Sequence, residues 1–152
     1  MSDDLKARAL RLLARREHTR AELARKLAPD AGSPDVLKEL IEQLTSRAQL
    51  SDERYAEARA HHLSRKFGAA RVRRELVAKG IEREAAARFA ADVEKTDLER
   101  ARSILARKYR DPAAAPKERA RRARFLQSRG FSLDVIRCAL DSLRAEASEE
   151  SP

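Results

Sequence analysis

The sequence predicts an all-α protein made of three repeated units, each containing three helices. Alanine, leucine, arginine and glutamate dominate the chain, and these residues are among the best helix formers. Apolar residues recur at helical spacing, and no segment alternates as a strand would. The segment Leu76–Ile81 also matches Leu126–Phe131 at an offset of 50 residues, a period typical of stacked helical units.

The first unit, residues 1–48, opens with a helix whose apolar face contains Leu5, Ala9, Leu12 and Leu13. Thr19 followed by Glu22 is the pattern of a capping box, which starts a short second helix ending near Leu27. A loop leads to Ser33-Pro34, a capping serine with proline at the first helical position. The third helix has one apolar side, made of Leu37, Leu40, Ile41 and Leu44.

The second unit, residues 49–95, opens at Ser51 with acidic residues near the positive end of a helix. Gly68 ends that helix, and Gly80 occupies a position that needs a left-handed backbone, followed by Ile81 as its apolar contact. The residues we expect to be buried in this unit are Tyr55, Ala56, Leu63, Phe67, Ala69, Val72, Leu76, Ala85, Phe89 and Val93.

The third unit, residues 96–145, repeats this plan. A proline- and alanine-rich loop separates its first two helices, Gly130 ends the second, and Ser132 caps the third. Its expected buried residues are Leu98, Ala101, Leu105, Tyr109, Val135, Ile136, Ala139, Leu140 and Leu143. Residues 146–152 are polar, and we expect a disordered tail there.

The net charge of +9 favours a polyanionic partner, and the charge is concentrated toward the C-terminal third. Residues 101–152 contain twelve cations and seven acids, whereas residues 1–50 contain ten cations and eight acids. No apolar stretch approaches the length that spans a membrane, and the acidic N-terminus does not resemble a signal peptide. We therefore expect a cytoplasmic protein, monomeric and without membrane contact. The lone Cys138 fits a reducing compartment, and we expect it to be a small core residue.

Catalysis, metal binding and cofactor binding find no support in the sequence. His61 and His62 are adjacent, so on a helix they point about 100° apart and do not share a metal. We expect both, together with His18, to be solvated residues of helix surfaces. The chain has no glycine-rich phosphate loop and no Ser/His/Asp set, so we predict that it is not an enzyme.

Two basic runs are the candidate binding residues. Residues 65–74 contain five cations and no acid, and residues 117–124 contain five cations and one acid. Cations three or four residues apart share a helix face and can follow phosphates. The aromatic residues fit helix-packing positions better than base stacking. The candidate contact residues are Arg65, Lys66, Arg71, Arg73, Arg74, Lys117, Arg119, Arg121, Arg122 and Arg124.

Four stretches in the same order resemble signatures of the RecX family of recombination regulators. They read RREHTRAELARKL at residues 15–27, LSDERYA at 50–56, GAARVRRELVAKGI at 68–81 and RFLQSRGFSLDVI at 124–136. One departure precedes the second stretch, where this family often has glycine and an aromatic residue and this chain has Ala48-Gln49. That change is expected to loosen packing between the first two units.

The resemblance implies an elongated, curved array of three three-helix modules that binds the RecA–DNA filament along its helical groove. It further implies inhibition of the ATPase, strand exchange and co-protease activities of RecA, and hence an effect on recombination and the SOS response. Charge clustering, rather than the resemblance, selects the ten candidate cations above. We expect them to contact acidic RecA surface, with DNA as a second, weaker and salt-sensitive partner.

Two alternatives remain at this point. The chain could be an autonomous DNA-binding protein of tandem three-helix repeats, because such units read the major groove. Repeats of the Myb kind depend on regularly spaced tryptophans, and this chain has none. The other alternative is a helical scaffold for an acidic protein unrelated to recombination.

Overall fold

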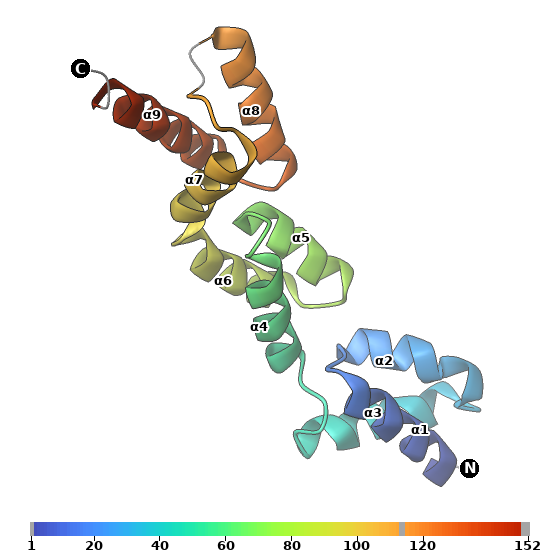
Figure 1. Cartoon of the computed structure of the whole chain (residues 1–152). Helices are drawn as coiled ribbons and strands as arrows, with labels where there is room; N and C mark the ends of the chain where they lie inside the picture. Colours follow the sequence, from blue (N-terminus) through green and yellow to red (C-terminus); the bar gives the residue numbers. More distant parts are fainter. Residues whose placement is uncertain (1, 113–114, 150–152) are drawn as a thin grey trace.

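The computed structural model in Figure 1 describes residues 2–112 and 115–149. Within these residues the chain forms nine α-helices and one short 3-10 helix, and no strand. The helices lie in three groups of three along an elongated molecule, with the two termini at opposite ends (Figure 1). The predicted all-α array of three-helix modules is confirmed.

Each module contributes three helices in sequence. The first module contains α1 (Ser2–Arg15), α2 (Arg20–Leu27), the 3-10 helix η1 (Ala28–Asp30) and α3 (Pro34–Ser46). The second contains α4 (Asp52–Leu63), α5 (Ala69–Ala78) and α6 (Arg83–Glu94). The third contains α7 (Asp97–Lys108), α8 (Pro116–Ser128) and α9 (Leu133–Glu149).

The helices begin where capping side chains hold their first free amides. Thr19 Oγ1 accepts a hydrogen bond from Glu22 N at 3.0 Å, and Ser51 Oγ accepts one from Arg54 N at 3.1 Å. Ser33 and Ser132 cap α3 and α9 in the same way. A cap of this kind stabilises a helix by about 1 kcal/mol. The predicted helix starts therefore follow from local chemistry at these positions.

Two glycines end α5 and α8 with the same geometry. Gly80 has φ +96° and Gly130 has φ +93°, as predicted for a left-handed residue after a helix. Ile81 N donates to Leu76 O at 3.0 Å, and Phe131 N donates to Leu126 O at 3.2 Å. Each turn thus satisfies orphan carbonyls of its helix and directs an apolar residue into the core behind it.

Each module has its own apolar core. The first centres on Leu23, Leu27 and Leu44, the second on Val72 and Leu76, and the third on Leu105 and Leu126, all fully buried. The three clusters are separate, as is typical of repeat proteins in which each unit contacts only its neighbours. The relative orientation of the modules therefore depends on two small junctions.

The first junction connects modules one and two through the start of α2. Thr19 Oγ1 donates to Lys79 O at 2.6 Å, and Arg20 N donates to Asp52 Oδ1 at 2.7 Å. Gly80 lies so close to module one that a Cβ there would stand 2.5 Å from Ala21 Cβ. An exposed ion pair adds to this junction.

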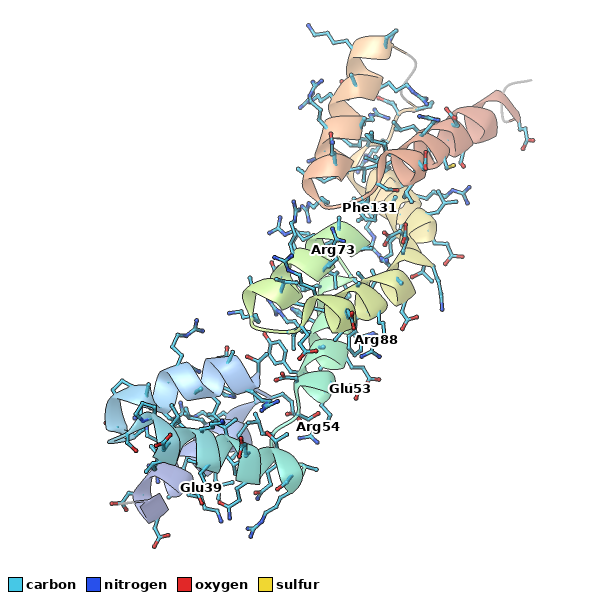
Figure 2. The ribbon with its side chains drawn as sticks, turned by 180° about the vertical axis from the view of Figure 1, so that it is seen from behind. Glu39, Glu53, Arg54, Arg73, Arg88 and Phe131 are labelled. Carbon is cyan, nitrogen blue, oxygen red and sulfur yellow. The ribbon has the colours of Figure 1, made fainter. Side chains whose placement is uncertain are left out.

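The partners in that ion pair are Glu17 and Arg54, whose Oε1 and Nε atoms are 2.9 Å apart. Figure 2 labels Arg54 at the start of α4, where the chain leaves the first module. In the connection just before α4, Ala48 adopts φ +58°. It is the only non-glycine residue with positive φ in the described part of the chain.

The second junction repeats this arrangement at the start of α5. Gly68 N donates to Arg129 O at 2.8 Å, and Ala69 N donates to Asp97 Oδ2 at 3.0 Å. In both junctions the turn before the third helix of one module docks on the second helix of the preceding module. In both, an aspartate caps that second helix, and this aspartate is the first residue of the helix that opens the following module: Asp52 caps α2 and Asp97 caps α5. The helix α8 offers no equivalent amide, because it begins with Pro116.

Three sequence expectations are wrong. His18 is 1% exposed rather than solvated, because the segment between α1 and α2 turns it inward. Cys138 is exposed rather than buried, since it lies on the outer side of α9. The expected tail at residues 146–152 is helical as far as Glu149, where α9 ends, and residues 150–152 lie outside the described residues.

Candidate anion-binding surface

The first basic run lies at the end of α4 and along α5. Arg65, Lys66, Arg73 and Arg74 are exposed. Arg71 is half-buried, and its Nε lies 3.7 Å from Glu75 Oε1. Its guanidinium also stands over the Phe67 ring, 4.3 Å from the ring centre. Four of the five predicted cations in this run therefore face solvent, while Arg71 also packs.

The second basic run lies on α8, and the structure divides it. Lys117, Arg121 and Arg124 are exposed, although Arg121 has Glu118 at 3.8 Å. Arg119 pairs with Asp141 and so ties α8 to α9. Arg122 differs from these residues because it is buried.

Arg122 is 5% exposed, which removes it from the candidate contact residues. Its Nη1 donates to Asp111 O at 2.6 Å, its Nε donates to Glu118 Oε1 at 3.3 Å, and its guanidinium stands 4.3 Å from the centre of the Tyr109 ring. The side chain instead closes the third module around the loop before α8, so we leave it out of the proposed contact set.

The fold brings the C-terminal end of α8, just past the second basic run, to the start of α5 at the second junction. The C-terminal end of α8 docks on the N-terminal end of α5, where Ala70 N donates to Gly130 O at 3.2 Å. Figure 2 shows Arg73 of α5 and Phe131 of the following module near each other at this boundary. Arg129 thus lies beside the first basic run, although it is distant in sequence.

Aromatic rings and cations alternate across this boundary, and we call the set the cation–aromatic row. Lys108 Nζ stands 3.6 Å from the centre of the Phe125 ring. Arg129 Cζ stands 5.1 Å from Phe125 and 5.5 Å from Phe67. Tyr109 packs edge-on against Phe125, with ring centres 6.3 Å apart. The members of the row are Arg71, Phe67, Arg129, Phe125, Lys108, Tyr109 and Arg122.

Sequence reasoning missed Lys108 and Arg129 as candidate contacts. Both lie just outside the basic runs that were counted, Lys108 at the end of α7 and Arg129 directly after α8. The offset of 50 residues relates Arg129 to Lys79, whose carbonyl also lies at a helix start, but that contact is visible only in the structure. A count of charge along the sequence cannot detect cations that gather through packing.

A buried polar cluster lies beside the first junction. Arg16 binds Glu22 through two contacts, at 2.7 and 3.3 Å. His18 Nδ1 lies 3.0 Å from Arg16 O and its Nε2 lies 3.0 Å from Lys26 Nζ, which fits a neutral ring that donates through Nδ1 and accepts at Nε2. Burial lowers the pKa of His18. Burial is the largest single influence on Glu22 and opposes its ionised form, but the hydrogen bond from Arg16 and the neighbouring positive charges of Arg16 and Lys26 together outweigh it, so the pKa of Glu22 is lowered.

Potential metal ligands do not gather in the described part of the chain. No group of three potential metal ligands occurs there, and His61 and His62 are exposed. Within the same residues, no helix combines the length and apolar character that crossing a bilayer requires. The candidate binding groups are therefore the exposed arginine and lysine side chains.

Comparison with known proteins places the chain in one family over most of its length. Residues 6–44, 51–88 and 95–140 match the first, second and third three-helix domains of RecX. This chain belongs to the RecX family. The RecX regulatory protein of Leptothrix cholodnii is 46% identical over 136 residues, which cover 90% of this chain and 87% of the relative.

A second RecX relative and a solved structure agree. The regulatory protein RecX of Herbaspirillum seropedicae is 45% identical over 138 residues, covering 91% of this chain and 90% of that protein. The crystal structure of RecX from Lactobacillus salivarius superposes with a TM-score of 0.80 at 21% identity, covering 95% of this chain and 97% of the other. The latter supports the fold, and the relatives carry the name of regulatory proteins.

Proposed function

We propose that this protein binds RecA–DNA filaments in the cytoplasm as a monomer and inhibits the ATPase, strand-exchange and co-protease activities of RecA, thereby affecting recombination and the SOS response. The observation that supports this proposal most directly is the extended array of three modules, which carries the two runs of closely spaced cations on its second and third modules. Family membership supplies the context.

An extended array can reach more than one protomer of a helical polymer. Once one module is bound, the contacts of the next become intramolecular, so their effective concentration is high. Bridging of this kind resists the movement between neighbouring subunits that accompanies ATP turnover. The array therefore slows the working cycle of the filament without any chemistry of its own.

The exposed cations are the residues that we assign to this contact. They are Arg65, Lys66, Arg73 and Arg74 in the second module and Lys117, Arg121 and Arg124 in the third. Arg71 and Arg119 are half-buried and pair with Glu75 and Asp141, so they are partly engaged within the protein. Acidic RecA surface is the main partner in this proposal, and filament DNA is the second.

The test is the DNA-dependent ATPase of RecA, measured with this protein added well below the RecA concentration. Inhibition at that ratio is expected. Absence of inhibition together with tight binding to naked duplex would instead favour an autonomous DNA-binding protein.

A charge-reversal pair then tests the surface. Arg73→Glu/Arg74→Glu is preferable to any change at Arg71, whose backbone and Cβ pack against Gly130. The inhibitor concentration needed for half inhibition should rise roughly tenfold or more, since like charges then face each other. The matched control is Arg25→Glu/Lys38→Glu on exposed positions of module one, and circular dichroism should show unchanged helicity in both.

A further inference from the structure

We infer that Lys108 and Arg129, held on the faces of Phe125 and Phe67, form a phosphate-binding edge for the DNA backbone. This inference rests on the proposed function and assigns residues to its second partner. It concerns the exposed side of the cation–aromatic row, across the boundary of modules two and three.

The rings that hold these cations are fixed in place by the cores of their modules. Phe125 packs on the third core and Phe67 packs on the second. Arg129 is also anchored by its backbone, because its carbonyl accepts the Gly68 amide at 2.8 Å. Its charge is thus positioned before any ligand arrives, so less side-chain entropy is lost on binding.

An aromatic face holds a cation without cancelling its charge. The quadrupole of the ring attracts the cation, but the ring carries no net negative charge. A carboxylate partner would neutralise the cation and occupy its donors. In the described part of the chain neither Lys108 nor Arg129 forms an ion pair, whereas Arg119 and Arg100 each have an aspartate. The positive charge of the two row cations therefore remains available to an external anion.

The chemistry of the row favours phosphates over bases. Phe125 has Lys108 and Arg129 over its ring, and Phe67 has Arg71 and Arg129, so these faces are already engaged. In proteins that bind single-stranded nucleic acids, the bases stack on aromatic faces that are open to solvent. A series of positive side chains can bind the successive negative phosphates of a DNA strand, and the guanidinium fork of arginine matches the geometry of a phosphate. The expected contact is therefore independent of base sequence.

The experiment is the binding of a fluorescein-labelled oligothymidylate of about 20 nucleotides, followed by anisotropy over a salt series without RecA. Lys108→Gln/Arg129→Gln should weaken binding at low salt about tenfold and lower the salt slope by roughly 1.4, near 0.7 per lost phosphate contact. The matched control, Arg25→Gln/Lys38→Gln, removes the same charge from module one and should change affinity less than about twofold. A duplex of the same length should rank the variants identically.

Two further variants separate folding from contact. Lys108→Gln alone alters one exposed terminal residue of α7 and should lose about half of the slope change. Phe125→Leu keeps every charge, so it should weaken binding about two- to threefold with the slope unchanged. Each variant is checked for native helicity and melting temperature.

The inference is overturned if the double variant loses no more affinity than its control, or if the wild type does not bind the oligonucleotide. It is also overturned if the double variant keeps its DNA affinity yet loses inhibition of the RecA ATPase, because the row then meets protein. In each of these cases the proposed function is tested separately, by whether the wild-type protein inhibits the RecA ATPase.

Discussion

The two junctions follow one plan but are built from different materials. At the second, backbone meets backbone: a Cβ on Gly68 would stand 2.5 Å from Gly130 O, and one on Gly130 would stand 2.5 Å from Arg71 Cβ. At the first junction most contacts involve side chains: the Thr19 hydroxyl donates to the Lys79 carbonyl, and Glu17 and Arg54 form a largely exposed ion pair. The corresponding aspartates differ as well.

Asp97 at the second junction is 2% exposed and pairs with Arg100, whereas Asp52 at the first is half-exposed. Buried, hydrogen-bonded charges are costly to disturb, while exposed ones contribute little. We therefore expect modules two and three to behave as one stiff body and module one to adjust its angle. The cation–aromatic row spans the stiff pair, which keeps its charges in register.

The largest expected effect comes from alanine at the glycines of the two junctions. Gly130→Ala forces a left-handed alanine and a clash with the Arg71 backbone, so it should lower the free energy of unfolding by about 3 kcal/mol or more. Gly80→Ala meets mainly the methyl group of Ala21, and the second change Ala21→Gly should recover part of its loss. Urea unfolding measures both, and equal losses without any rescue would contradict the difference between the junctions.

The aspartates should show the next largest difference. Asp97→Asn leaves Arg100 without its buried partner and should cost about 3 kcal/mol. Asp52→Asn retains an acceptor for Arg20 N at a half-exposed position and should cost less than about 1 kcal/mol. Thermal melts of the two variants give the comparison directly. Similar losses at both positions would mean that the first junction is as rigid as the second.

The loss of stability in acid should arise mainly from His18 and Glu22 in module one. The pKa of His18 is lowered in the folded state, so the unfolded chain binds the proton first as the pH falls. Its stabilising contribution is complete above pH 6.5 and is lost as the pH falls from there toward the lowered pKa. The lowered pKa of Glu22 adds a further loss below about pH 4.5.

The measurement for this prediction is the urea midpoint between pH 8 and pH 4. His18→Gln should flatten the part of the curve nearest pH 6, with His61→Gln as an exposed control that leaves the curve unchanged. A curve that is the same in all three proteins would mean that the buried imidazole does not govern this response.

The smallest effect concerns the connection into α4. Ala48 holds φ +58°, where a side chain costs about 1 kcal/mol relative to glycine. Ala48→Gly should therefore raise stability by up to about 1 kcal/mol, less the added freedom of the unfolded chain. The family pattern that places glycine near this position has its physical reason here. A melting temperature that falls in this variant would show that the entropy term wins.

Local features were the ones that the sequence predicted well. The caps at Thr19, Ser33 and Ser51 and the left-handed turns at Gly80 and Gly130 depend on neighbours a few residues away. The spacing of Cys138, two residues from both Ile136 and Leu140, already placed it away from their face of α9. Cysteine is often buried, but here the helical spacing, not the residue type, decides its exposure.

Features that depend on distant packing could not be read in the same way. The burial of His18 and Arg122 depends on residues of other elements, and arginine is seldom buried unless it is paired. The same holds for the junctions, where Asp97 and Arg129 meet α5 only because the modules dock. Repeat matching detected the turns, but it could not say what they touch.

The proline that begins α8 has a consequence for how long such a protein can grow. Both docked helices present an amide at their first residue, Arg20 N or Ala69 N, to an incoming aspartate, and Pro116 has none. A fourth unit appended in the same manner would leave its carboxylate without that donor. An added unit would therefore dock more weakly than the existing ones unless Pro116 were replaced by a residue with a free amide.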